Sequence, residues 1–387
     1  MIIPYGKQSI TAEDLEAVVS ILQGEYLTQG PSILEFEQSF AQYIGAKYAV
    51  AVSNGTAALH LSALALDVNS SSNYITSPIT FAASANCIRY CGGTVWFADI
   101  NPNSFLLDID KTEDLIRSKP KGFFTGIILV DFAGYPANTE EFRILADKYD
   151  LKIIEDACHA PGGYFSDSKS NLVKCGDGRY ADLSIFSFHP VKHIATGEGG
   201  MITTNSETLY KKLLVLRTHG ITKDFSLFTN SASEVAQGGW YYEMQELGYN
   251  YRLTDFQAAL GSSQLKRANE GLKRRREIAK HYNNAFANLD SNIITPESPE
   301  GHAFHLYVIR TKRRKELYDY LREKNIFTQV HYIPVHLQPY YRNLGWKVGD
   351  FPNAEEYYHQ CLSLPMYPTL SLDEQQYVID SVINFFK

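Results

Sequence analysis

Cysteine, tryptophan and long hydrophobic runs are scarce in this chain, and each shortage excludes a class of protein. The 387 residues include five cysteines and three tryptophans. Five scattered cysteines do not make the dense framework of a small disulfide-stabilised secreted domain, so we expect reduced thiols and a cytoplasmic protein. No apolar run approaches the roughly 20 residues of a membrane-spanning helix. The opening residues lack a basic segment followed by an apolar core, so we expect no secretory signal.

Positive charge is also limited. Thirty-six Lys and Arg stand against 43 Asp and Glu, which gives a net charge of −7 at pH 7. An acidic balance argues against binding to nucleic acid or to an anionic membrane. The basic run Lys273–Arg276 has acidic neighbours, and we interpret it as a solvated helix face. Hydrophobic residues make up 44% of the chain, which is typical of a folded globular protein, and 387 residues are enough for two or three domains, or for one large domain with an appendage.

Strand and helix patterns alternate through the first two thirds of the chain. Two helices, at 11–23 and 31–44, come first, and the first one has apolar residues at helical spacing. Strands and helices then alternate, which predicts an α/β domain (residues 1–264) with a mostly parallel, doubly wound, seven-stranded sheet. Ligands of such a sheet bind at the carboxyl ends of its strands. The candidate strands are Tyr48–Val52, Tyr74–Ser77, Val95–Asp99, Gly126–Asp131, Lys152–Asp156, Leu183–Ser187 and Met201–Thr204.

The pattern changes from about Leu265. A long helix is expected to about Leu289, and a last helix after Ser371. Between them we expect a strand at 303–310, a helix at 312–324 and a strand at 327–332. These elements predict a small C-terminal α+β domain, residues 265–387. The long irregular stretch Lys223–Gly248 is typical of a lid or binding loop.

Three motifs follow predicted strands, where the sheet would bind its ligand. In Ser53–Ala58 a strand ends, a glycine turn follows and a helix begins, which suits a phosphate, although an ordinary helix cap explains the motif alone. In Ile153–His159, Asp156 is placed to hold a cationic group; a metal with His159, or a solvated acid pair, would also fit. In Phe186–His193, Lys192 stands between a His-Pro turn and the glycine-rich segment 197–200. A partly buried lysine there would have a lowered pKa and could form a Schiff base.

Pyridoxal phosphate needs all three features together. The cofactor requires a phosphate cradle, an acid for its pyridinium nitrogen and a Schiff-base lysine. The order of the three motifs along one α/β domain therefore favours pyridoxal phosphate over the separate interpretations of each motif.

The chain also resembles, over its whole length, the DegT/StrS-type sugar-nucleotide aminotransferases, which belong to fold type I of the pyridoxal phosphate enzymes. Within that family it is most similar to the transaminases of pseudaminic acid synthesis, through Ile3–Gly6, Ser77–Phe81 and His331–His336. Gln29 and Cys158 depart from the residues that many members have there. The family motifs are Leu27–Pro31, Asn54–Leu59, Glu155–Ala160, Phe186–Lys192, Gly197–Gly200 and Gly248–Arg252.

The resemblance implies a role for each matching residue. Lys192 would carry the cofactor and move the proton, Asp156 would hold the pyridinium nitrogen, and His159 would lie near the ring hydroxyl. Asn250 would reach the phosphate from the neighbouring subunit of a homodimer, whose active sites are shared. The other cofactor residues implied are Gly55, Thr56, Ala57, Ser187 and, stacked on the ring, Phe81. The residues implied for the sugar nucleotide are Tyr5, Glu25, Tyr26, Leu27, Thr28, His331, Tyr332, Ile333 and Pro334, so that the first 30 residues contribute to the substrate site.

The implied reaction is transfer of an amino group from L-glutamate to the C4 ketone of a UDP-linked 4-keto-6-deoxy-N-acetylhexosamine. Another nucleotide-linked ketosugar, such as a 4-keto-arabinose or a dTDP-ketosugar, is an alternative substrate. A non-catalytic regulator on the same fold is a more distant alternative, but such a protein would not need Lys192. We expect no metal: His331 and His336 lack cysteine or carboxylate neighbours, and Cys87 with Cys91 fits two buried thiols on one helix face.

Overall fold

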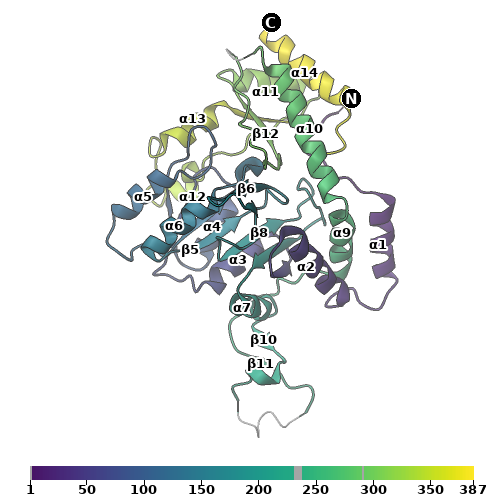
Figure 1. Ribbon diagram of the computed structural model, residues 1–387, viewed down its shortest axis with the longest axis vertical. Helices are drawn as coiled ribbons and strands as arrows, with labels where there is room; N and C mark the ends of the chain where they lie inside the picture. The colour runs from purple at the N-terminus through teal and green to yellow at the C-terminus, as the bar shows by residue number, and fades with distance from the viewer. Residues whose placement is uncertain (1, 231–237, 290–291) are drawn as a thin grey trace.

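A seven-stranded sheet with helices on both faces forms the largest body of the protein (Figure 1). The computed structural model describes residues 2–230, 238–289 and 292–387. The strand order is β1-β9-β8-β5-β4-β2-β3. Each predicted strand lies within about two residues of its expected position, because each is a short buried apolar run, as parallel strands require. The strands are β1 (Tyr48–Val52), β2 (Asn73–Thr76), β3 (Thr94–Phe97), β4 (Gly126–Val130), β5 (Lys152–Asp156), β8 (Leu183–Ser187) and β9 (Gly200–Thr204). The predicted α/β fold is confirmed.

The one reversed strand, β9, determines where the site lies. Strands β2, β3, β4, β5 and β8 are parallel, whereas β9 is antiparallel to both of its neighbours, β8 and β1. Ser187 at the end of β8 pairs with Gly200 at the start of β9, and Gly200 also pairs with Val52 at the end of β1. The carboxyl ends of β1 and β8 therefore meet at one edge of the sheet, and residues 188–199 cross that edge.

The two faces of the sheet have separate apolar cores because alternate side chains of each strand point in opposite directions. On β5, Ile154 packs into one core with α3, α4 and α7, whereas Ile153 packs into another with α5 and α6. A third core joins α2 and α9 to the sheet. The helices of this region are α1 (Ala12–Leu22), α2 (Pro31–Ile44), α3 (Gly55–Ala65), α4 (Ala82–Tyr90), α5 (Ile109–Arg117), α6 (Thr139–Tyr149), α7 (Glu207–Arg217) and α9 (Asp255–Leu265).

Helix α1 forms where the apolar spacing predicts it, but its apolar side chains do not enter a core. Leu15, Val19 and Leu22 are 60%, 47% and 55% exposed. The helix lies along α9, where its buried residue Asp14 accepts hydrogen bonds from the guanidinium of Arg267. The outer face of α1 is thus an apolar surface on this chain.

The C-terminal part has an apolar core of its own, and its helices α10, α11 and α14 lie together at the top of Figure 1. Helices α10, α11 and α14 pack on the antiparallel pair β12 and β13, and Ile3 from the N-terminal segment inserts among them. The elements are α10 (Ala268–Phe286), β12 (Tyr307–Arg310), α11 (Arg314–Glu323), α12 (Pro339–Arg342), α13 (Pro352–Gln360), β13 (Cys361–Leu364) and α14 (Leu372–Phe386).

One expected strand is wrong. Residues 327–332 are extended but belong to no strand, and their only bridge is from Gln329 to Ser363. The partner of β12 is β13, a short apolar run that the sequence pattern did not single out. The segment leaves the ladder because His331 and Tyr332 turn instead toward the large cavity described below.

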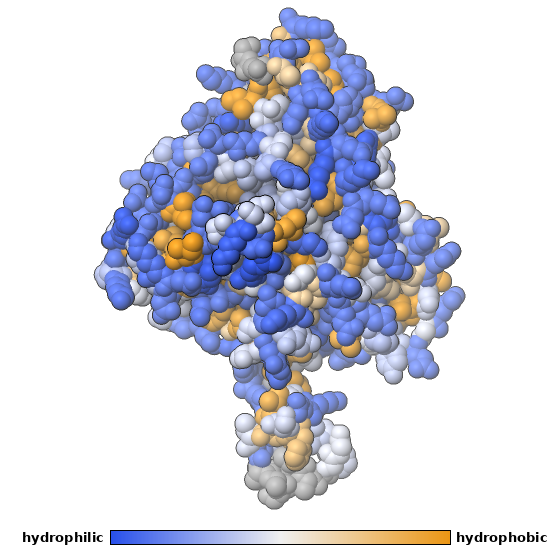
Figure 2. Space-filling model, viewed as in Figure 1, coloured by the Kyte–Doolittle hydropathy of each residue, from blue (hydrophilic) through white to orange (hydrophobic). Residues whose placement is uncertain are grey.

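The expected loop Lys223–Gly248 lies in an arm that projects away from the sheet, beyond α7 (Figure 1). Its base is a short antiparallel ladder of β10 (Ile221–Thr222) and β11 (Glu243–Met244), and residues 231–237 lie outside the described part of the chain. Phe225, Trp240 and Leu247 are each more than 70% exposed. Figure 2 shows apolar residues along this arm. A third two-stranded ladder, β6 (Tyr164–Ser166) with β7 (Leu172–Lys174), was not predicted from the sequence.

Across the described residues, no helix is both long enough and apolar enough to span a membrane.

Candidate active site

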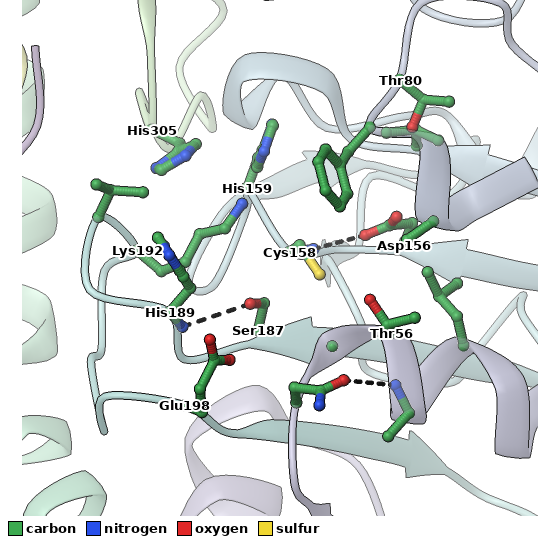
Figure 3. A pocket seen from close by; sticks show the side chains of 18 of the residues that line it. Thr56, Thr80, Asp156, Cys158, His159, Ser187, His189, Lys192, Glu198 and His305 are labelled. Atoms are coloured by element: carbon green, nitrogen blue, oxygen red, sulfur yellow. Dashed lines mark hydrogen bonds between the residues drawn. The ribbon is translucent and has the colours of Figure 1, made fainter. Parts of the chain in front are cut away.

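A cavity of about 830 Å³ opens at the sheet edge where β1, β5 and β8 end. Its walls come from both halves of the chain. Figure 3 shows Lys192, His159 and His305 on one side of it and Asp156 and Thr56 on the other. The sequence-predicted residues that line it are Tyr5, Gly55, Thr56, Ala57, Phe81, Asp156, His159, Ser187, Lys192, His331 and Tyr332.

The start of α3 has the chemistry of a phosphate cradle. Asn54 caps the helix by accepting a 2.8 Å hydrogen bond from the Ala57 N–H, which leaves the N–H groups of Gly55 and Thr56 as the open end of the helix dipole. A Cβ on Gly55 would lie 2.9 Å from Cβ of Ser187. Only glycine therefore lets the helix approach the Ser187 hydroxyl this closely, and the resulting set of donors fits a phosphate group.

Asp156 ends β5 and is held by two donors. The Ser84 hydroxyl donates to Oδ2 at 2.7 Å, and the Cys158 N–H donates to Oδ1 at 3.2 Å. Thr80 lies 2.7 Å from the Ser84 hydroxyl. Asp156 is only 6% exposed, so the sequence alternative of a solvated acid pair is wrong. A buried, oriented carboxylate of this kind fits a protonated pyridinium nitrogen.

Lys192 lies on the segment that crosses the sheet edge. The segment is fixed at both ends, because the Phe188 N–H donates to Gly199 O at 2.8 Å and the Thr196 N–H donates to Phe188 O at 2.9 Å. Burial lowers the pKa of the Lys192 amine, while Cys158 and Asp156 partly offset that effect. A lowered pKa increases the fraction of neutral amine, which is the form that attacks an aldehyde.

His159 and His305 form a neutral imidazole pair at the cavity wall. Their ring centroids are 4.3 Å apart, and burial lowers the pKa of both rings well below the ordinary value. Nδ1 of His159 accepts a 3.2 Å hydrogen bond from the Ala133 N–H, so the neutral ring carries its proton on Nε2. That nitrogen lies 3.4 Å from the hydroxyl of Tyr332.

Some wall residues were missed by the sequence reasoning. His305 and Thr80 line the cavity, and Ser84 acts on it through its hydrogen bond to Asp156. Thr80 lies in the segment Ser77–Phe81, but the resemblance implied a role for none of the three. Their side chains reach the site only through the tertiary fold. The remaining cavity residues that were not predicted as site residues include His60, Cys158, Glu198 and Tyr251.

Other predicted site residues do not line this cavity. Residues 25–28, Ile333 and Asn250 are exposed, and Pro334 is buried outside the cavity wall. Thr28 forms a bridge with Thr254, and Asn250 forms one with Thr218. Their implied contacts with substrate or with a neighbouring subunit's cofactor remain predictions.

A cluster of buried acidic groups lies on the other face of β5 from Asp156. Glu155, the residue before Asp156, points to that face and lies close to Asp131 and Cys175. The Ser184 hydroxyl and the Gly176 N–H donate to Glu155 at 2.7 and 3.0 Å. Burial raises the pKa of Asp131 well above its ordinary value and that of Glu155 to about 7. The two carboxyl groups therefore hold a proton at neutral pH.

The two histidines considered for a metal have separate partners. Nδ1 of His331 lies 2.8 Å from the Ser363 hydroxyl, whereas Nε2 of His336 lies 3.0 Å from Glu355. Cys87 is buried and Cys91 partly buried, both with free thiols, on and just after α4.

The model of the DegT/DnrJ/EryC1/StrS aminotransferase family matches residues 8–383. The chain belongs to this family. The identification agrees with the resemblance found in the motifs, and it makes this protein an aminotransferase.

Curated relatives match over nearly the full length. A Methanocaldococcus jannaschii protein, named only as uncharacterized, is 40% identical over 98% of this chain and 96% of its own. The Bacillus subtilis spore coat polysaccharide biosynthesis protein SpsC is 38% identical over 100% and 97%. A Campylobacter jejuni UDP-4-amino-4,6-dideoxy-N-acetyl-beta-L-altrosamine transaminase is 35% identical over 99% and 97%.

Solved structures agree. The aminotransferase PseC of Helicobacter pylori, described as involved in pseudaminic acid biosynthesis, superposes with a TM-score of 0.88 at 30% identity, covering 100% of this chain and 99% of that one. A putative sugar aminotransferase of Streptococcus pneumoniae, solved in its PLP form, has a TM-score of 0.86 at 27% identity, covering 98% and 97%. This aminotransferase is therefore a pyridoxal phosphate-dependent sugar aminotransferase of fold type I, and the cradle at Gly55 fits that cofactor. The alternative of a non-catalytic regulator is not supported.

Proposed function

We propose that this aminotransferase moves the amino group of L-glutamate to the C4 ketone of a UDP-linked 4-keto-6-deoxy-N-acetylhexosamine, a reaction of pseudaminic acid biosynthesis. The observation that carries the proposal is the convergence of Lys192, Asp156 and the α3 cradle on one cavity. The substrate class comes from the relatives named for a UDP-sugar and for pseudaminic acid.

Each residue at the cavity has a task in this proposal. The N–H groups of Gly55 and Thr56 hold the cofactor phosphate with the Ser187 hydroxyl, and Ala57, whose N–H is bound by Asn54, fixes the start of the helix beside it. Asp156 keeps a proton on the pyridinium nitrogen. When bound, pyridoxal phosphate supplies an electron sink for the carbanion that forms when the substrate loses its proton.

Lys192 moves that proton. Its Nζ would take the proton from the substrate carbon that bears the amine and deliver it to the aldehyde carbon of the cofactor, which requires a neutral amine at working pH. Burial lowers the pKa of Lys192 and so favours that form. His159, with Nδ1 fixed by Ala133, presents an Nε2–H to the ring hydroxyl side. Phe81, half exposed toward the cavity, would stack on the ring.

We propose that the sugar nucleotide lies on the exposed side of the cavity, between Tyr5, His331 and Tyr332 and a neighbouring subunit. The exposed residues Glu25 to Thr28, with Ile333 and Pro334, would complete that wall. The apolar outer face of α1 and the exposed arm at 221–248 support a homodimer, since apolar surfaces of this kind are typical of subunit interfaces. Asn250 would then reach the partner's cofactor. The free thiols of the five cysteines support a cytoplasmic location.

A second candidate substrate has its own support. SpsC is more similar to this chain than the Campylobacter transaminase is, and its name points to spore coat polysaccharide. Another nucleotide-linked ketosugar, such as a dTDP-ketosugar or a 4-keto-arabinose, would need the same chemistry at Lys192.

The test begins with the visible spectrum of the purified enzyme. A yellow band that fades on addition of L-glutamate is the expected result, and Lys192→Ala should show no such change. The enzyme whose yellow band has faded is then mixed with each of a panel of UDP- and dTDP-linked ketosugars, and the products are analysed by mass spectrometry. Return of the band with a UDP-linked 4-keto-6-deoxy-N-acetylhexosamine supports the first candidate. Return only with another sugar replaces it by the second, and no band after cofactor addition contradicts both.

A further inference from the structure

A second cavity, of about 280 Å³, adjoins the segment that carries Lys192. Lys192 lines both cavities, whereas His193 and Ala195 line only the second one. The second cavity lies among the N-terminal segment, the start of α10 and Pro368. We call it the cationic pocket and define it by Lys7, His193, Arg267, Glu270, Arg274 and Arg275.

The pocket has an excess of positive charge in a chain whose net charge is −7. Arg267 is neutralised by Asp14, which lies 2.8 Å from its Nη1. Arg274 donates to the carbonyl oxygen of Leu370 at 2.9 Å, and its ion pair with Glu277 is long, at 3.5 Å. Lys7 has no ion-pair partner among the described residues. Glu270 is the one carboxylate among the residues that line the pocket, and it cannot balance the positive charges of Lys7, Arg274 and Arg275.

Arg275 is the most informative of these residues. It is 2% exposed, and its Nη1 donates to the carbonyl oxygens of Phe304, His305 and Met366 at 3.0 to 3.2 Å. No carboxylate pairs with it within the described chain, and its buried Nε has no hydrogen-bond partner. A buried cation without a counter-charge is strongly unfavourable, so its retention beside a cavity indicates that an anion pairs with it.

His193 is a second indication that the pocket binds a ligand. Its Nε2 is also buried without a hydrogen-bond partner, and the residue lines the same pocket. Buried polar atoms in proteins are nearly always hydrogen-bonded, and atoms that are not commonly mark a missing ligand or water. Both unpartnered atoms belong to residues that line the cationic pocket, where a bound acceptor group would satisfy them.

The active-site cavity has no comparable excess of positive charge with which to bind an anionic group. Among the residues that line it, Lys192 is the single Lys or Arg, and Asp156 and Glu198 are acidic. We propose that the cationic pocket is a binding site for a phosphate or carboxylate group, held by Lys7, Arg274 and Arg275. The anion is either free phosphate or an anionic group of a substrate in the proposed function; the charge requirement is the same for both.

Occupancy of this pocket would act on Lys192. Arg275 is one of the charges that lower the pKa of Lys192, and it also lowers the pKa of His193. The other charges that act on Lys192 are those of Cys158 and Asp156, on the active-site side. An anion beside Arg275 would offset the positive charge, and the pKa of Lys192 would rise. The pocket therefore provides a way for an anion to adjust the protonation of the lysine without entering the active site.

Titration calorimetry on the holoenzyme at low ionic strength tests the proposal. The bound cofactor keeps the α3 cradle filled, so heat from inorganic phosphate reports on another site. L-glutamate and UDP are titrated in parallel to separate the two sources. We expect at least one of the three to bind, and the double variant Lys7→Gln/Arg274→Gln to weaken that binding about tenfold. Lys273→Gln, an exposed neighbour on α10 outside the pocket, is the matched control and should leave binding unchanged.

The absorbance of the holoenzyme gives a second readout. The pH midpoint of its visible band should rise when the pocket is filled, and this rise should be absent in the double variant. Phosphate binding that the double variant weakens assigns the pocket to the free anion. L-glutamate and UDP also bind at the active site in the proposed function, so only a loss of their affinity in the double variant assigns the pocket to a substrate group. Affinities for all three ligands that are equal in the double variant and wild type, or phosphate binding that is absent together with such equal affinities for L-glutamate and UDP, overturn the proposal. The visible band and its response to L-glutamate report separately on the proposed function.

Discussion

Ser84 donates a 2.7 Å hydrogen bond to Oδ2 of Asp156, and both side chains are buried. The same hydroxyl lies 2.7 Å from Thr80, so α4 and the turn before it fix the carboxylate at the end of β5. The relationship makes Ser84 a positioning residue: it would act on the cofactor only through Asp156.

Replacing Ser84 should impair the reaction without abolishing it. Ser84→Ala removes a donor to a buried carboxylate, and we expect kcat to fall about tenfold. The pH dependence of the visible band should also shift, because a less well-oriented Asp156 holds the pyridinium proton less firmly. Ser62→Ala, which loses a buried hydrogen bond within α3 to Ala58 O, is the control and should affect stability alone. An unchanged band and unchanged kcat in Ser84→Ala would show that Asp156 needs no support from Ser84.

A methyl group at Gly55 should block cofactor binding. Its carbon would lie 2.9 Å from Cβ of Ser187, so the start of α3 would move away from β8. We expect Gly55→Ala to raise the dissociation constant of pyridoxal phosphate about a hundredfold, measured by titration of the visible band. Gly239→Ala is the control, since no atom lies within 4 Å of the added carbon. Equal affinity in the two variants would contradict the assignment of the cradle.

The buried pair of Asp131 and Glu155 should make stability fall as pH rises. Both folded-state pKa values are raised above the ordinary 3.8 and 4.5, that of Glu155 to about 7. The folded protein therefore binds more protons than the unfolded chain across this range, so stability is lost as pH rises from about 4.5 through 7. For Glu155 alone the shift corresponds to roughly 3 kcal/mol.

Asp131→Asn should reduce that loss, because an amide does not ionise and can donate to Glu155. Chemical denaturation at pH 5 and pH 8 measures the difference. We expect the free energy of unfolding of the variant to change less between the two pH values than that of the wild type. At pH 8 the variant should be the more stable protein. A pH dependence identical to wild type would show that the two carboxyl groups do not share a proton.

We proposed that Asn250 of each subunit contacts the cofactor of the neighbouring subunit. Two inactive variants should therefore complement each other in a mixed dimer. Lys192→Ala and Asn250→Ala should each be inactive as homodimers. In a mixed dimer, if Asn250 serves the neighbouring site, one site combines an intact Lys192 with an intact Asn250, and activity returns. Co-expression with two affinity tags isolates the mixed dimer for assay. An inactive mixed dimer would place Asn250 in its own subunit's site, whereas an active Asn250→Ala homodimer would place it outside both sites.

The sheet and the motifs at its edge could be predicted because their signals are local. Strand β5 is a mostly buried run that ends at Asp156, with His159 three positions on, and the turn before α3 follows β1 in a similar way. The carboxyl ends of strands in such a sheet meet at one edge, so residues that follow different strands were expected to converge.

Contacts between distant segments could not be predicted. Ser84 and Asp156 are 72 positions apart, and no pattern in the sequence pairs them. His305 likewise reaches His159 from the segment just before β12. The apolar spacing in α1 identified a helix correctly but not the surface it faces, because spacing gives the side of a helix and not its partner. The expected strand at 327–332 was wrong for a related reason. Its pattern did not identify the partner of β12, which is the equally apolar run of β13.

The span of the cavity along the chain has a consequence for synthesis. Tyr5 and Tyr332 line the same cavity, and Ile3 packs into the C-terminal core. Contacts between such distant positions form late, after the chain between them has been ordered. A polypeptide still emerging from the ribosome lacks the cavity even when its sheet has formed. Acquisition of yellow colour would therefore mark completed chains, and truncated products would stay colourless whatever their secondary structure.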